Sequence, residues 1–300
     1  MRLTAESHTS PLLCKAIIIA CIGLVGVFAC GKAQHGSEQQ ASIQQAPISI
    51  IDTSGENINT RIIPPAGYSR IPCDSLSFGY YLRHLPLKPH EASVHYYDGS
   101  IKMNPNIYIA VVDQPIGNKD LHQCADAVMH LRADYLWQTG QYDRIHFDLT
   151  NGFRMEYAQW MAGNRLVVSG NQTSWKKTAE ASNTASDLWA YLEKVFTFAG
   201  TLSLSRELVS VERDDMQPGD VFIKGGSPGH AEIVVDMAMD TITGKKIFLL
   251  AQSFMPAQET QILCNNEEPE ISPWYNLDFG TSLHTPEYWF NDTQLMRFQD

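Results

Sequence analysis

Apolar and polar positions repeat with different periods along this chain, and each period predicts a different kind of element. Over residues 120–137 apolar side chains recur at spacings of three and four, which is one face of a helix. A second helix is expected over residues 184–200, with Ser186 or Thr184 as its cap and Gly200 at its end. Asp120 and Gln123 resemble a capping box for the first helix.

Extended segments surround these helices. Three of them, 220–224, 230–238 and 246–254, follow one another closely and are separated by the turn sequences "GGSPG" and "DTITG". Earlier segments carry turn signals at Asp98-Gly99, Asn151-Gly152 and Gly163-Asn164, and the last two predict hairpins between the helices. Extended pieces, a helix and then consecutive antiparallel strands form an α+β pattern rather than a repeated βαβ unit.

The N-terminal apolar run predicts a targeting segment. Lys15 precedes apolar residues 16–29, and this run is shorter than the roughly 20 residues of a membrane-spanning helix. It is typical of a secretory signal. Its end, "VFAC", resembles a bacterial lipobox, in which the signal is cut before the cysteine and the sulfur of Cys30 carries lipid. The alternative is an ordinary secretory signal or an uncleaved anchor, with no role for Cys30.

Composition divides the chain into three parts. Residues 1–29 are the expected lipoprotein signal peptide, and the polar, Gln- and Ser-rich residues 30–57 are the expected disordered tether. Residues 58–300 remain as a single globular domain. The formal net charge is -11, which disfavours nucleic acid and gives no polybasic membrane patch.

A cysteine near a predicted helix start is the first candidate for chemistry. The positive end of a helix dipole favours the thiolate of Cys124. His230 opens a predicted strand after a glycine turn, so we expect its imidazole at the rim of a sheet, placed to exchange a proton with that thiol. Each residue also has a structural interpretation, as a buried thiol and as a histidine that satisfies a turn carbonyl.

Strand geometry predicts the third member of the site. If Ala238 pairs with Lys246, Gln252 lies on the same face as His230 and diagonally across from it. A long amide there would hold the imidazole in one orientation. A register shift of one residue would turn Gln252 away and leave Ser253 or Asp236 as candidates.

Two resemblances bear on this site. The stretch "PGDVFIKGGSPGHAEIVVDMA" resembles the histidine segment of NlpC-type, papain-like cell-wall peptidases, and "QCADAV" loosely resembles their Asp-Cys-Ser-Gly helix start. Ala125-Asp126 replaces the usual Ser-Gly, and Glu232 stands where the resemblance implies an apolar residue. Over most of its length, in stretches such as "IHFDLTNGFR" and "LLAQSFMPAQE", the chain resembles a lipoprotein family of Bacteroides-type bacteria that is catalogued as a domain of unknown function.

Other chemistry has little support in the sequence. There is no His-Glu-x-x-His motif, no paired Cys-x-x-Cys motif and no phosphate-binding loop, so neither a metal nor a cofactor is expected. Cys73 and Cys264 are either a disulfide or two unpaired thiols. The aromatic residues of the C-terminal segment either line a groove or pack on the core: Trp274, Tyr275, Tyr288 and Trp289.

These patterns lead to one expected function and one alternative. We expect a lipid-anchored protein of the bacterial cell envelope, outside the cytoplasm, whose papain-like α+β domain cleaves amide bonds in peptidoglycan stem peptides. Cys124 would be the nucleophile, His230 the general base and acid, and Gln252 the orienting group. The alternative is a non-catalytic envelope domain that binds peptide or glycan. Whether Cys124 and His230 meet distinguishes the two.

Overall fold

The computed structural model describes residues 49–299. The predicted signal peptide, the lipidation site at Cys30 and residues 30–48 of the predicted tether lie outside the described residues. Within residues 49–299 no helix is both long enough and apolar enough to cross a membrane.

The domain begins earlier than the sequence pattern indicates. Residues 49–57 were expected to belong to the tether, but Ile50 and Ile51 pack against the hydrophobic core. Asn57 caps the first helix, since its side-chain oxygen accepts a hydrogen bond from the backbone N–H of Thr60. The apolar and capping residues of this short segment are therefore part of the folded domain.

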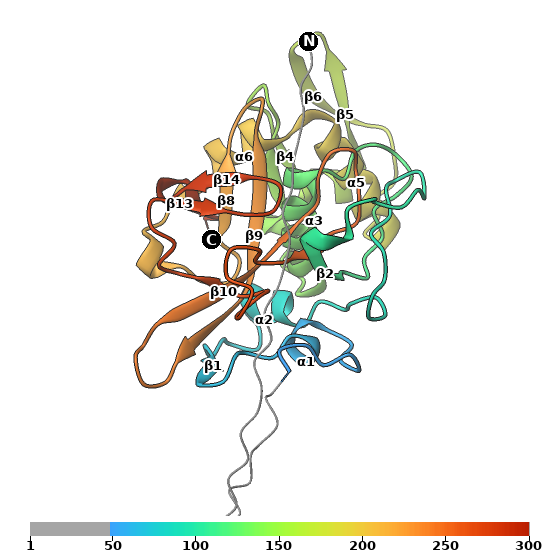
Figure 1. The fold of residues 1–300 in the computed structure, drawn as a ribbon. Coiled ribbons are helices and arrows are strands. Elements are labelled where there is room, and N and C mark those ends of the chain that lie inside the picture. The colour runs from blue at the N-terminus through green and yellow to red at the C-terminus, as the bar shows by residue number, and fades with distance from the viewer. Residues whose placement is uncertain (1–48, 300) are drawn as a thin grey trace, which may run out of the picture. The chain divides into compact units, whose positions relative to one another are not determined.

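Short helices and many short strands make up the domain (Figure 1). The helices are α1 (Ile58–Arg61), α2 (Phe78–Arg83), α3 (Cys124–Gln138), α4 (Tyr157–Met161), α5 (Ala185–Phe198) and α6 (Thr201–Glu207), with 3-10 turns η1 (Pro105–Ile107), η2 (Tyr142–Arg144), η3 (Arg213–Asp215) and η4 (Asp292–Gln294). The strands are β1 (Tyr68–Arg70), β2 (Tyr108–Val111), β3 (His146–Asp148), β4 (Arg154–Glu156), β5 (Asn164–Ser169), β6 (Gln172–Lys177), β7 (Val209–Ser210), β8 (Val221–Lys224), β9 (His230–Asp240), β10 (Lys246–Gln252), β11 (Gln261–Leu263), β12 (Tyr275–Asn276), β13 (Ser282–His284), β14 (Trp289–Asn291) and β15 (Leu295–Arg297).

A large antiparallel sheet organises the domain, as the α+β pattern predicts. Its strand order is β2-β11-β10-β9-β8-β15-β7, with β1 added beside β9 and β12 beside β10. The long hairpin of β9 and β10 is its centre (Figure 1). The half of this hairpin near His230 lies between β8 and β11, and the half near the turn lies between β1 and β12.

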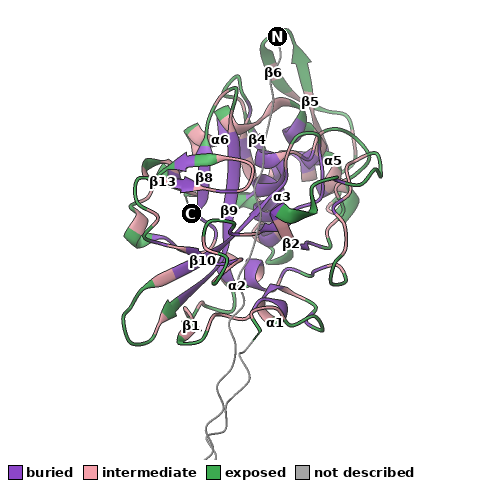
Figure 2. Ribbon diagram, viewed as in Figure 1, coloured by how far each residue is buried: buried purple, intermediate pink, exposed green. Residues whose placement is uncertain are grey.

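Both faces of this sheet are covered. Helices α2, α3 and α6 pack on it, and α5 packs on α3. Apolar side chains on the opposite face of the sheet, such as Phe222 and Leu250, form a second cluster with Leu283 and Phe290 of the β13–β14 hairpin. Helix α3 and strand β9 are consequently buried along nearly their whole length (Figure 2). Helix α3 therefore has little solvent-facing surface, and most of its polar side chains are buried as well.

The β9–β10 register differs from the predicted one near the turn and agrees with it near the site. Ala238 lies opposite Ile247, not Lys246. A β-bulge then shifts the pairing by one residue, so that Leu250 lies opposite Val234. This is the pairing that the predicted register gives at the same point. The bulge therefore keeps Gln252 on the face of His230.

The helices also differ from their predicted bounds. Helix α3 begins at Cys124, not at Asp120, because the Asp120 carboxylate is used elsewhere: its Oδ1 accepts hydrogen bonds from the Gln123 side chain and from the backbone N–H of Ala257. Thr184 caps α5, as predicted. Four further helices, α1, α2, α4 and α6, were not predicted, since each is only four to seven residues long.

Candidate functional site

Cys124 is the first residue of α3. Gln123 is the N-cap residue, and its backbone N–H donates to Oδ2 of Asp126, at 3.1 Å, which closes the first turn. The backbone N–H groups of a helix's first turn have no partner within the helix and point beyond its end. The Cys124 thiol is therefore held, mostly buried, at the positive end of a 15-residue helix.

A cavity of about 320 Å³ lies at this helix end. Its walls come from four parts of the chain, and its lining includes Cys124, Asp126, Thr201, Met255 and the glycine turn 226–229. Among the residues that line it there is neither lysine nor arginine. The cavity thus gives a small molecule or a chain segment access to the thiol side of the helix.

Asp126 is an unusual member of this cavity wall. It is 6% exposed, and its Oδ1 has no hydrogen-bond partner among the described residues. Burial raises the pKa of its carboxyl to about 8, although the backbone N–H groups of Gln123 and Asp126 act in the opposite direction. At neutral pH the group is therefore largely protonated and carries no charge.

His230 is the first residue of β9. Gly229 precedes it in a turn with no room for a side chain, because a Cβ there would lie 2.5 Å from Oγ1 of Thr201. The imidazole is not at an exposed rim as expected; His230 is 1% exposed, since its ring packs against Phe254 at 4.8 Å and Tyr288 at 4.9 Å between centroids. The ring is fixed in the interior, away from bulk water.

Gln252, at the end of β10, contacts this ring. Its Oε1 lies 2.6 Å from Nε2 of His230. Its amide nitrogen donates to Oε2 of Glu287 at 2.6 Å, and Lys102 Nζ donates to the same carboxylate oxygen. Since the ionised carboxylate only accepts, the amide is oriented with its oxygen toward the histidine. Nε2 of His230 is therefore the N–H donor, and Nδ1 is left for another partner.

Cys124 is one of the neighbours that affect the charge of this ring. Burial lowers the pKa of His230, but hydrogen bonds to the Cys124 thiol and the Glu232 carboxylate, together with their charges, outweigh burial and raise the pKa to about 10. The imidazole is thus a cation at neutral pH. The structure brings together all three side chains that the sequence analysis selected.

Glu232 adds a second buried carboxylate. Its Oε1 lies 3.5 Å from Nε2 of His230 and accepts a hydrogen bond from Thr285 at 2.7 Å, whereas its Oε2 has no partner among residues 49–299. The residue is fully buried. Its contact with Nε2 is longer than that of Gln252, and its charge adds to the stabilisation of the imidazolium.

The two alternatives to Gln252 have other partners. Asp236 forms ion pairs at 2.6 Å with Arg70 and Arg83. Ser253 donates to the backbone oxygens of His122 and Gln258. Neither contacts His230.

Sequence reasoning did not identify Lys102 and Glu287. They lie far from Gln252 along the chain, in segments without regular secondary structure, and meet it only because the loops at this end of the sheet converge. No motif or period in the sequence marks either residue.

The remaining candidates have structural positions. Trp274 and Tyr275 are buried in the core, Tyr288 packs on His230, and Trp289 is exposed and stacked on His284. The predicted aromatic groove is therefore mostly core packing. Cys73 and Cys264 are both free thiols. In the described part of the chain, no group of three or more His, Cys, Asp or Glu is arranged to hold a metal ion.

Two buried histidines, His122 before Cys124 and His130 within α3, lie next to each other. Nε2 of His122 is 3.2 Å from Nδ1 of His130, and both rings are buried. Burial lowers the pKa of His122 to about 3, with a further contribution from His130, and lowers the pKa of His130 to about 4. Both are neutral at physiological pH and pack α3 against the segment that leads to Cys124.

Comparison with known proteins gives one match. A family model described as Domain of unknown function (4846) matches residues 58–297. No curated protein and no solved structure matches this chain at the threshold applied.

Proposed function

This chain belongs to the family Domain of unknown function (4846), which carries no assigned activity, and we propose that it is a thiol hydrolase with Cys124 as its nucleophile. The substrate proposed is an amide bond in peptidoglycan stem peptides, by resemblance to NlpC-type, papain-like peptidases. The observation that carries the proposal is the sequence of contacts from Cys124 to His230 to Gln252. A nucleophile, a proton carrier and an orienting amide are the minimum parts of such a site.

The proposed reaction begins from a thiolate and an imidazolium. The Cys124 sulfur attacks the carbonyl carbon, a C–S bond forms and the carbonyl electrons move to oxygen. His230 gives its Nδ1 proton to the departing nitrogen, the C–N bond breaks and an amine leaves. Water then attacks the thioester while His230 takes a proton from it. The C–S bond breaks, which releases a carboxylic acid and restores the ion pair.

Two features support charge development at this position. The backbone N–H groups at the start of α3 are donors for an oxyanion. The Asp126 carboxyl, neutral at pH 7 because burial raises its pKa to about 8, lines the same cavity without adding a negative charge beside the developing one. An ionised aspartate there would oppose the reaction.

The envelope location is proposed on the sequence alone. The apolar residues 16–29 and the "VFAC" stretch support a lipid anchor at Cys30, with the domain outside the cytoplasm. Palmitate labelling of the expressed protein is expected and should disappear in Cys30→Ala. Labelling that persists in that variant would refute the anchor and leave the proposed chemistry untouched.

A binding function on the same scaffold is the second candidate, and burial favours it. His230 and Gln252 are each 1% exposed, and Cys124 is 8% exposed. A substrate must enter through the cavity at Cys124 alone, since the histidine is covered from other directions. A non-catalytic domain would keep these residues as a buried polar network that orders the sheet end.

Hydrolysis of defined substrates distinguishes the two. The full chain is incubated with a muropeptide digest, and new amine and carboxyl termini are identified by mass spectrometry. Cleavage that is lost in Cys124→Ala and strongly reduced in His230→Gln is expected. Equal products from wild-type protein and Cys124→Ala, or no cleavage together with saturable binding of the digest, would favour the binding domain.

A further inference from the structure

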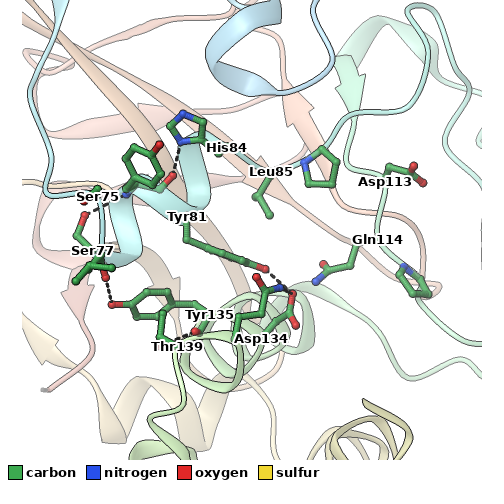
Figure 3. A pocket seen from close by; sticks show the side chains of 15 residues that line it. Ser75, Ser77, Tyr81, His84, Leu85, Asp113, Gln114, Asp134, Tyr135 and Thr139 are labelled. Atoms are coloured by element: carbon green, nitrogen blue, oxygen red, sulfur yellow. Dashed lines mark hydrogen bonds between the residues drawn. The ribbon is translucent and has the colours of Figure 1, made fainter. Parts of the chain in front are cut away.

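A hollow with a mainly apolar lining lies away from Cys124, toward the other end of α3. Its volume is about 470 Å³, which is within the usual range of small-molecule sites. Its walls are α2, the last turns of α3 and the segment 113–115 that follows β2 (Figure 3). It shares no lining residue with the cavity at Cys124. A ligand here would be bound independently of the proposed reaction.

Aromatic rings provide much of its apolar surface. Tyr80 stacks on His84, with 4.0 Å between ring centroids, and Tyr81 packs against Tyr135 at 5.8 Å. Leu76 at the rim is 75% exposed. Exposed apolar surface beside stacked rings favours a ligand that carries an apolar chain.

The charged groups of the hollow are all of one sign. Asp113 and Asp134 are among the lining residues, and neither lysine nor arginine is. The Tyr81 hydroxyl and the Gln138 amide both donate to Oδ2 of Asp134, at 2.6 and 3.0 Å. Burial and the charge of Asp134 raise the pKa of Tyr81 well above its usual value, so the hydroxyl remains the donor. The carboxylate is held in place by donors at one oxygen.

Gln114 extends from the opposite wall toward the Tyr81–Asp134 pair (Figure 3). Its Oε1 is buried and has no hydrogen-bond partner among the described residues. A buried carbonyl oxygen without a donor destabilises the protein, because it has lost its hydrogen bonds to water without replacement. A ligand that supplies an N–H group beside Asp134 would satisfy this oxygen and neutralise the carboxylate together.

We infer that this hollow is a binding site for a primary ammonium group carried on an apolar chain. The carboxylate of Asp134 supplies the counter-charge, Gln114 Oε1 accepts a second N–H, and the rings of Tyr80, Tyr81 and Tyr135 contact the apolar part. Cations also gain from the faces of aromatic rings, which adds to this selectivity. An anion of the same size is excluded because nothing in the lining neutralises it.

Calorimetric titration of the full chain with n-pentylamine at pH 7 tests the site. Saturable 1:1 binding is expected, at least tenfold tighter than for n-pentanol or pentanoate, and it should weaken as sodium chloride is raised. Asp134→Asn keeps the side-chain shape and an acceptor for Tyr81, and should weaken pentylamine binding at least tenfold. The exposed Asp143→Asn is the matched control and should bind as wild type.

A second variant keeps the test decisive if Asp134→Asn folds poorly by thermal melting. Gln114→Met retains the charge and removes the buried acceptor, so pentylamine should bind several-fold more weakly while pentanol is unaffected. The inference is overturned if pentylamine does not saturate, if it binds no better than pentanol, or if folded Asp134→Asn binds it unchanged.

Discussion

The alkylation rate of Cys124 is the most direct measure of its pairing with His230. Because the pKa of His230 is about 10, only about one imidazole in 10⁴ is neutral at pH 6. Opposite charges about 4 Å apart attract by about 4 kcal/mol at an effective dielectric constant of 20. Loss of the imidazolium charge therefore removes a large favourable interaction from any negatively charged neighbour.

His230→Gln removes this charge and should slow iodoacetamide labelling of Cys124 at pH 6. A thiolate that is less stabilised is also more nucleophilic, with a Brønsted slope of about 0.4–0.5, which offsets part of the loss, so we expect a net fall of about tenfold. Gln252→Ala should slow labelling less, because Gln252 orients the ring and supplies no charge. Peptide mass spectrometry after timed quenching gives the rate for each cysteine in one digest.

Two internal controls and one stability control belong to this assay. Cys73 and Cys264 are free thiols in the same chain, and burial raises the pKa of Cys264 to about 11, so its labelling should be slow throughout. His230→Gln leaves the buried charge of Glu232 unpaired, and the double variant with Glu232→Gln restores neutrality. If Cys124 labels no faster than Cys73 in folded protein, and its labelling rate is the same in His230→Gln and Gln252→Ala, it is a core thiol and the proposed catalysis is wrong.

Three further outcomes are expected. Deletion of residues 1–48 should leave the melting temperature unchanged, whereas deletion of residues 1–57 should lower it by several degrees, and equal values by calorimetry would contradict the observed domain start. Glu287→Leu should reduce any cleavage rate and the labelling rate of Cys124 while the protein stays folded, since the Gln252 amide is then free to rotate. Unchanged rates would show that Glu287 has no role in the site. The pKa values of His122 and His130 in the folded protein lie below 6.5, so at acidic pH the unfolded chain binds more protons than the folded one. The free energy of unfolding should therefore be constant above pH 6.5 and should decrease as the pH falls toward 4 and 3. The decrease is at most about 3 kcal/mol per pH unit for the two histidines together. Urea unfolding between pH 7 and 5 measures this decline, and His130→Leu should have about half of it.

Local sequence signals predicted the parts of the fold that depend on local physics. Thr184 caps α5 because its hydroxyl is the acceptor nearest the first turn. Strands β8, β9 and β10 were predicted because short turns that contain glycine separate them. The same signals selected Cys124, His230 and Gln252, which now lie together. Their catalytic roles remain a prediction.

Features that depend on distant contacts were not predictable. Asp120 was expected to cap a helix, but its carboxylate accepts a hydrogen bond from the backbone N–H of Ala257, far along the chain. His230 was expected at an exposed rim, but Phe254 and Tyr288 cover it. The Glu287 carboxylate that orients the amide comes from a loop. In each case the deciding partner is not adjacent in sequence, so no local period carries the information.

The bulge in the β9–β10 hairpin has a consequence for protein engineering. It separates the hairpin into an outer half, beside β1 and β12, and an inner half that ends at His230 and Gln252. Each half has its own strand register. The turn at residues 241–245 is therefore a suitable insertion point for a fluorophore or an affinity tag, because a change of length there leaves the register of the inner half unchanged. Removing one residue at the bulge, by contrast, would exchange the two faces of everything beyond it.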